Sequence, residues 1–389
     1  MSCPKPSKLK PCRQQQLCDY MIRLLIKFLI LAVMLLGLPL LGIWVAGYPL
    51  LDYLEFPPQT RYVRHAPFSG WAFVLYSLLI AACTAPLIFR AFKPSPQNLS
   101  ISRQSARSIP AWGWLGLILG MVAWIMAWTR FNWFAAFQPH TFTPLWVAFI
   151  VVINAFGYRH NGYCMLRCRP RFFLLLFPIS AAFWWFFEYL NRFVQNWYYI
   201  GPEFSATEYF WYATLPFATV LPAVLGLRDI LMSSRWLQQR FNYFAPLRLR
   251  HSKPIAALIL ALSAGGLAGI GIWPNFLFPL LWVSPLLIIL CLQTLMGERH
   301  LLSQLTTGNW TPLVAAALAA LICGLFWEMW NVFSLAKWKY SIPLVHRFAV
   351  FEMPLLGYAG YLPFGLQCAV VGSLLENVVP ADAPEAVGL

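Results

Sequence analysis

The chain has 389 residues, of which 60% are hydrophobic and only 11% are charged, and its formal net charge is +15. Soluble domains usually carry about 25% charged residues. Apolar runs of about 20 residues recur along this chain instead, which excludes a set of soluble domains and predicts an all-α, polytopic membrane protein. The alternating pattern of a membrane β-barrel does not occur in the sequence.

Residues 1–110 are predicted to hold a basic N-terminus, two membrane helices and an exoplasmic loop. A secretory signal would have a shorter apolar core and a small-residue cleavage site, whereas the apolar run from Leu24 to Ala46 is long enough to span a membrane. We therefore interpret it as an uncleaved first span and expect a second over 71–90. The loop between them carries His65, a side chain that can act as an acid or a base near neutral pH. An ordinary polar loop is the alternative interpretation.

Eight further apolar runs bring the number of predicted spans to ten. They cover 111–129, 143–158, 172–190, 208–227, 255–273, 276–295, 311–330 and 352–375. The short connection around Pro274 predicts a helical hairpin between the seventh and eighth spans. The loops and ends on one side hold 21 basic and 6 acidic residues, and those on the other side hold 7 of each. By the positive-inside rule both termini are expected to be cytoplasmic, in a bacterial inner (plasma) membrane.

Charge and cysteine usage narrow the expected partners. The basic residues are dispersed over five loops and ends, which favours contact with membrane lipids over binding of nucleic acid. The nine cysteines are scattered singly, so we interpret them as reduced packing residues. No spacing typical of a metal site and no Gly-rich phosphate loop occurs, and the sequence predicts neither a metal nor a cofactor. It leaves the oligomeric state and any protein partner open.

An internal repeat is indicated by landmarks that recur at matched spacings. The segments "FFEYLNRF" and "LFWEMWNVF" each contain Glu-x-x-Asn at the end of an apolar run. The other landmarks are Arg159-His160 with Arg299-His300, Trp133 with Trp273, and "NWYYIGP" with "KWKYSIP", the last pair at a one-residue shift. We infer two tandem units of four spans, residues 111–228 and 255–376, followed by a short cytoplasmic tail, 377–389. Such parallel units are typically related by a pseudo-twofold axis along the membrane normal.

The repeated motifs supply the main candidate site. Glu188 and Glu328 lie near the exoplasmic ends of the fifth and ninth spans, and carboxylates at membrane depth are costly and often functional. We expect them to do acid/base or headgroup-binding work, with Asn191 and Asn331 orienting a substrate. A structural network at two equivalent helix ends is the competing interpretation.

Local spacing predicts different partners for the two glutamates. Arg192, four residues after Glu188, is positioned to pair with it. Glu328 has no such neighbour and is expected to be neutral or to reach a basic side chain of the following loop: Lys337, Lys339, His346 or Arg347. Glu352 is a weaker candidate, because it precedes Pro354 at an expected helix start, where a carboxylate suits the positive end of the helix dipole.

The aromatic residues around both glutamates suggest an apolar pocket that would hold a carboxylate away from water. The leading hypothesis is an integral membrane enzyme or handler of a lipid or isoprenoid-like substrate, working near the exoplasmic interface between the two repeats. A transporter that uses the repeat interface and a non-catalytic assembly subunit are the alternatives, and the sequence does not decide whether the protein is an enzyme.

Overall fold

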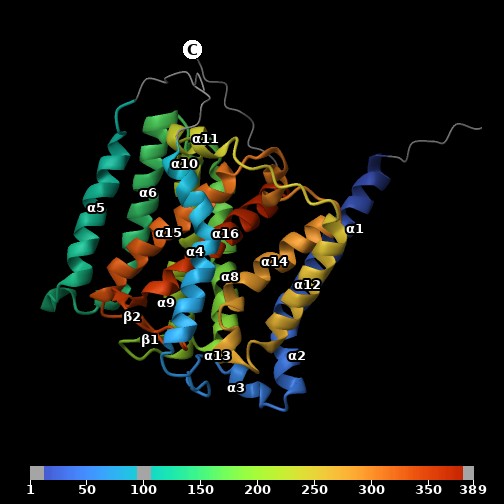
Figure 1. Cartoon of the computed structure of the whole chain (residues 1–389). Coiled ribbons are helices and arrows are strands. Elements are labelled where there is room, and N and C mark those ends of the chain that lie inside the picture. Colours follow the sequence, from blue (N-terminus) through green and yellow to red (C-terminus); the bar gives the residue numbers. More distant parts are fainter. Residues whose placement is uncertain (1–12, 94–106, 380–389) are drawn as a thin grey trace, which may run out of the picture.

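The computed structural model describes residues 13–93 and 107–379 (Figure 1). Most of these residues are helical, and nine helices or helical runs in this part of the chain are long and apolar enough to cross a membrane. The prediction of a helical, multi-pass membrane protein is therefore confirmed. The basic leader up to residue 12, residues 94–106 and the end of the tail from residue 380 lie outside the described residues.

The first span is a continuous helical run with a local change of pitch. α1 (Arg13–Ala32) passes through a π-helical turn, η1 (Val33–Gly37), into α2 (Leu38–Val45). The short helix α3 (Leu50–Leu54) follows, and α4 (Gly70–Phe92) forms the second span. α4 is unusual because none of its residues is buried.

The next four spans include one that is broken. α5 (Ala111–Trp128) leads through the short turns η2 (Asn132–Phe134) and η3 (Gln138–His140) to α6 (Phe142–Asn161), and α7 (Met165–Cys168) leads to α8 (Pro170–Val194). The sixth span consists of α9 (Ala206–Phe217) and α10 (Val220–Met232). At the break, the buried Ser180 hydroxyl donates to the Phe217 carbonyl (2.6 Å) and accepts from the Leu221 amide (2.9 Å), so a neighbouring helix satisfies the interrupted backbone.

The second half contains the shortest of the apolar helices. α11 (Arg235–Phe241) is followed by α12 (Ser252–Gly269), α13 (Pro274–Leu277) and α14 (Leu280–Leu295). α12 and α14 pack together, as the predicted hairpin requires. Ten long spans were predicted, but α14 has only 16 residues and falls short of the nine others in the described part of the chain. Pro274 is the first residue of α13 and Pro279 is the N-cap of α14, so the helical run is divided there and α14 is short.

The remaining helices complete the bundle. η4 (Leu301–Thr307) precedes α15 (Thr311–Val332), and η5 (Leu355–Gly360) leads into α16 (Tyr361–Glu376). The buried core lies mainly among α6, α8, α10, α14, α15 and α16. α4 crosses in front of these helices in Figure 1, and its main contacts are with α11 and η5.

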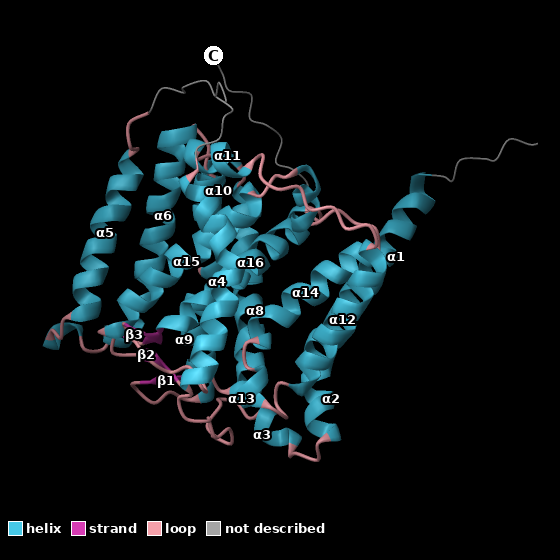
Figure 2. Cartoon of the chain, viewed as in Figure 1, coloured by secondary structure: helices cyan, strands magenta, loops and turns pink. Residues whose placement is uncertain are grey.

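The described residues also form four short strands, which the all-α prediction did not include. β1 (Trp197–Ile200) follows α8, β2 (Lys337–Tyr340) follows α15, and the two pair antiparallel. A smaller pair consists of β3 (Ala349–Val350) and β4 (Met353–Pro354). We call β1 and β2 together the ribbon. Figure 2 shows the strands at one end of the helical bundle and α11 at the other.

Candidate functional site

The asparagines of the two Glu-x-x-Asn motifs fasten the ribbon to the helices. The Asn191 side-chain amide donates to the Trp197 carbonyl at 2.8 Å, and that of Asn331 donates to the Trp338 carbonyl at 2.8 Å. Each amide oxygen in turn accepts from the backbone N–H of the same tryptophan, at 3.4 Å and 3.0 Å. Both ends of each amide are thus used by the backbone. In this structure the two side chains position the strands, and neither lines the cavity described below.

Glu188 is buried and accepts three hydrogen bonds from aromatic side chains. The donors are Trp184 Nε1 at 3.1 Å, Trp197 Nε1 at 3.0 Å and the Tyr199 hydroxyl at 2.6 Å. The predicted pair with Arg192 does not form, because that guanidinium donates to the Glu55 carbonyl just after α3. The strand that follows α8 therefore satisfies this carboxylate, and the neighbouring turn of its own helix contributes one donor.

Glu328 is fully buried and has aromatic partners of its own. Its Oε1 accepts from the hydroxyl groups of Tyr340 (2.6 Å) and Tyr361 (2.8 Å). Its Oε2 is buried without a hydrogen-bond partner among the described residues. Buried polar atoms usually find a partner, so an unpartnered oxygen here is a feature that needs an explanation.

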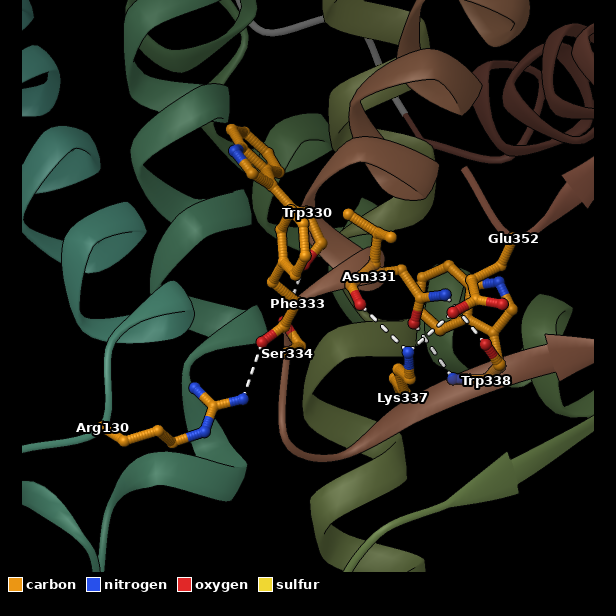
Figure 3. A network of polar contacts seen from close by, with 9 residues as sticks. Arg130, Trp330, Asn331, Phe333, Ser334, Lys337, Trp338 and Glu352 are labelled. Carbon is orange, nitrogen blue, oxygen red and sulfur yellow. Dashed lines mark hydrogen bonds and ion pairs between the residues drawn. The ribbon is translucent and has the colours of Figure 1, made fainter. Parts of the chain in front are cut away.

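The loop cations predicted for Glu328 are engaged elsewhere or make no ion pair with it in the described structure. Lys337 lies 2.6 Å from Glu352 and also donates to the Val332 carbonyl at 3.0 Å. Figure 3 shows this lysine between the two groups, beside the Asn331 contact with Trp338, and Arg130 donating to the Phe333 carbonyl. These bonds hold the turn between α15 and β2, so they position the strand that carries Tyr340.

Glu352 occupies a different place from the one predicted. It lies in the turn between β3 and β4 and not at a helix start, since η5 begins at Leu355. Its partner is the Lys337 ammonium group, and both side chains are about one-fifth exposed. The helix-dipole interpretation is therefore wrong, because two short strands form where a helix start was expected.

His65 lies in a loop that covers the ribbon end of α8. Its ring nitrogens contact the Ser341 hydroxyl (2.5 Å) and the Val194 carbonyl (2.8 Å), which joins the end of α8 to the residue after β2. Burial lowers the pKa of His65 below its ordinary value. The loop also bonds Gln195 at Val63 and Thr60. His65 does not line the cavity described next, so its visible role is to fasten the loop.

A large cavity begins at the ribbon and extends along the bundle. Its volume is about 1750 Å³. We call the part beside the ribbon the aromatic end; it is lined by Trp184, Trp197, Tyr199, Trp338, Tyr340 and Tyr361. The far end reaches Trp236 and Phe241 of α11, and α4 lines one side along most of its length. α15 lines the cavity from Leu313 to Trp327, a distance of about 21 Å along a helix.

The aromatic end separates both glutamates from the cavity. Every donor to Glu188 and Glu328 lines the cavity, whereas the two carboxylates are not among the described lining residues. Burial and the neighbouring carboxylates raise the pKa of the Tyr199 and Tyr340 hydroxyls, so both stay protonated at neutral pH and donate. A ligand in the cavity would therefore contact the sides of these tyrosines and tryptophans that are turned away from the carboxylates.

Sequence reasoning named the two glutamates but missed the groups in front of them. Trp197 and Tyr199, and likewise Trp338 and Tyr340, are two residues apart, which places each pair on one face of a strand. That alternation is visible in "NWYYIGP" and "KWKYSIP", although the sequence alone does not show that it directs these side chains at the carboxylates. Tyr361 comes from a distant helix, and no local signal links it to Glu328.

No group of three or more His, Cys, Asp or Glu that could hold a metal ion occurs within residues 13–93 and 107–379. Comparisons of the chain with protein-family models, with curated proteins and with solved structures each return no match.

Proposed function

We propose that this integral membrane protein binds a lipid or isoprenoid-like molecule in the cavity, with the polar end of the molecule at the ribbon. The observation that carries the proposal is the cavity itself, which is about 1750 Å³ and follows α15 from Leu313 to Trp327. Sites for compact small molecules usually measure about 300–1,000 Å³. A volume of this size and length suits a long chain better than a compact metabolite.

The chemistry of the wall supports an apolar chain. Between its two ends the cavity is lined mainly by aliphatic side chains of α4 and α15, among them Leu79, Ile80, Leu87, Leu318 and Leu321. A polar ligand placed there would lose its hydrogen bonds to water without replacement, at a cost of several kcal/mol. A hydrocarbon chain forms no hydrogen bonds to water and therefore has no such cost.

α4 provides the proposed route of entry from the bilayer. None of its residues is buried. Near one end Tyr76 packs on Phe278, and near the other end Arg90 donates to the Arg240 carbonyl. The middle of the helix therefore separates the cavity from the surroundings with little packing to hold it. A membrane-embedded ligand would enter by displacing this helix, without leaving the hydrocarbon layer.

The polar groups at the aromatic end would receive the headgroup. In this proposal Tyr199, Tyr340 and Tyr361 touch the ligand, and Glu188 and Glu328 act through them as positioning residues. A proton exchanged with the ligand would pass through a tyrosine hydroxyl, because the hydroxyls stand between the carboxylates and the cavity. Asn191 and Asn331 support these tyrosines by fixing the strands.

We also propose that residues 111–228 and 255–376 are related repeats, with the ribbon on their pseudo-twofold axis. The equivalent bonds support it: Asn to the tryptophan carbonyl at 2.8 Å and Tyr hydroxyl to Glu at 2.6 Å occur in both halves. In the proposed orientation the ribbon is exoplasmic and both termini are cytoplasmic, in a bacterial inner membrane, as the loop charges indicate.

A second candidate is the movement of such a lipid between the two leaflets. The cavity is lined by residues of the ribbon at one end and of α11 at the other. A site that reaches both ends of the bundle fits transport as well as a reaction at one surface. Flipping of a fluorescent lipid in reconstituted vesicles would distinguish transport from binding alone.

The test is extraction and mass spectrometry of the lipids that purify with the protein. Ala317 faces the cavity partway along α15, and Ala317→Trp would fill part of it. Ala261→Trp, on the exposed side of α12, is the matched control. We expect one lipid species to be enriched with the wild type and the control and to be lost from Ala317→Trp. Equal bulk membrane lipid in all three preparations would overturn the proposal.

A further inference from the structure

We infer that the aromatic end of the cavity takes a positively charged headgroup, an organic ammonium, carried on the long-chain ligand. The inference rests on the proposed function, since it names the headgroup of the same ligand. The evidence for it is the set of charged groups around the cavity and the aromatic rings that line it.

Two buried carboxyl groups lie behind the aromatic end. Glu188 and Glu328 are 7% and 0% exposed, and neither takes part in an ion pair among the described residues. A buried carboxylate without a counter-charge is costly. The unpartnered Oε2 of Glu328 shows that hydrogen bonds from the protein do not fully satisfy that group either. A cation in front of the tyrosines would supply the missing counter-charge.

None of the nearby basic side chains forms an ion pair with either glutamate among the described residues. Lys337 lines the cavity, but Glu352 neutralises it at 2.6 Å. Lys339 lies between Trp338 and Tyr340 in β2, so its side chain is on the outer face of the ribbon and it does not line the cavity. Arg192 donates to the Glu55 carbonyl. Glu203 lines the cavity and adds another negative charge.

The rings at the aromatic end suit an ammonium group. Trp282 stacks on Trp197 with ring centroids 5.6 Å apart, and Trp327 stacks on Tyr361 at 5.9 Å. These contacts hold large π-faces in fixed positions around the same volume, and all four residues line it. Cations bind over aromatic faces, and quaternary ammonium ligands are typically held in cages of such rings.

The tyrosine hydroxyls also favour a positively charged headgroup. Tyr340 donates its proton to Glu328 at 2.6 Å, and Tyr199 donates its proton to Glu188 at 2.6 Å. With their protons directed at the carboxylates, the hydroxyl oxygens offer lone pairs to other groups. A phosphate or carboxylate headgroup would meet hydroxyl acceptors and ring faces with two carboxyl groups behind them, and Lys337, the one lysine among the described lining residues, is already paired. An anionic headgroup is therefore disfavoured here.

The experiment uses the full-length protein in nanodiscs of uncharged lipid. Three hexadecyl probes with a photoreactive group in the chain differ only in the headgroup: trimethylammonium, hydroxyl or phosphate. Labelling is mapped by mass spectrometry at Leu321, which lines the cavity, and is divided by labelling at Leu258, which is 61% exposed on α12 and does not line the cavity. This ratio corrects for the amount of probe in the bilayer and for any unfolded protein.

We expect the trimethylammonium probe to give a ratio about tenfold above those of the other two, the size that a desolvated cation–π contact provides. The excess of the trimethylammonium ratio over the hydroxyl ratio should disappear in the variant Glu188→Gln with Glu328→Gln, because the two amides carry no charge. Equal ratios for all three probes in the wild type, or a higher ratio for phosphate, would overturn the headgroup inference and leave the proposed lipid site standing. No labelling of Leu321 by any probe would overturn both.

Discussion

Trp197 in β1 lies directly across the ribbon from Tyr340 in β2. The same register places Tyr199 across from Trp338, so each tyrosine that holds a glutamate faces the tryptophan of the other strand. The two carboxylate sites are therefore joined through one small sheet. A change that shifts either strand should therefore alter the hydrogen bonds at both glutamates.

Asn331→Ala should destabilise the protein by loosening β2. The substitution removes two hydrogen bonds to the Trp338 backbone and leaves its partly buried N–H and C=O without these partners. Each buried group that stays unsatisfied costs about 1–3 kcal/mol of stability. Thermal unfolding in a mild detergent should show a lower midpoint. Asn132→Ala, at an exposed position in η2, is the control. Identical midpoints for both variants would contradict the anchoring role.

Tyr340→Phe should cost more stability than Tyr361→Phe. Tyr340 donates to Glu328 and accepts from Trp338 Nε1 at 2.8 Å, whereas the Tyr361 hydroxyl donates to Glu328 and holds no indole N–H among the described residues. Loss of the first hydroxyl thus leaves an indole N–H and part of a carboxylate without a partner. The double variant should lose more than the two single losses combined, because Glu328 then has neither of its hydroxyl donors. Additive losses in a double-mutant cycle would contradict this coupling.

The membrane helices could be predicted from the sequence because run length and apolarity alone decide them. α8 and α15 begin and end within a few residues of the expected spans. The ribbon could not be predicted in the same way. Its strands are only four residues long, and their pairing joins positions about 140 residues apart, so nothing local specifies the partner. The sequence also suggested Arg192 for Glu188 on helical spacing, while a backbone carbonyl beyond α3 binds that side chain instead.

One wall of the cavity is α4, and the position of this helix could not be predicted from its sequence pattern. α4 is apolar on all sides, with Leu75, Leu78, Leu79 and Ile88 all more than half exposed. A helix without a polar face gives no periodic signal that shows which side meets the bundle. Candidate residues were therefore named at the glutamates, where charge makes them conspicuous, and not along the apolar wall that gives the site its size.

A reagent attached to Cys83 should report on the cavity. Cys83 is an exposed free cysteine on α4, and it lines the cavity. In a variant that keeps this cysteine alone, modification with an N-alkyl maleimide should reduce the amount of co-purifying lipid. Ala82→Cys in a cysteine-free background is the control, since that neighbouring position is exposed and does not line the cavity. Equal lipid retention after modification at both positions would argue against a ligand beside α4.

His65 should make the stability of the ribbon end depend on pH. Its folded pKa lies below the value of about 6.5 expected in the unfolded chain, chiefly because burial disfavours the charged ring. The charged or titratable groups that act on it are His346 and Arg61, and both lower its pKa further. The stabilisation is therefore complete above about pH 6.5 and is lost as the pH falls toward the folded pKa, because the unfolded chain takes up the proton first.

The measurement is the midpoint of thermal unfolding at pH 8, 6.5 and 5 in one detergent. The wild type should lose more stability on acidification than His65→Gln, which keeps a side chain able to bond Ser341 or the Val194 carbonyl but cannot gain a proton. His160→Gln, at the exposed end of α6, controls for the removal of a histidine elsewhere. If the wild type and His65→Gln lose the same amount between pH 6.5 and pH 5, the acid sensitivity belongs to other groups and His65 is only a neutral fastening of the loop.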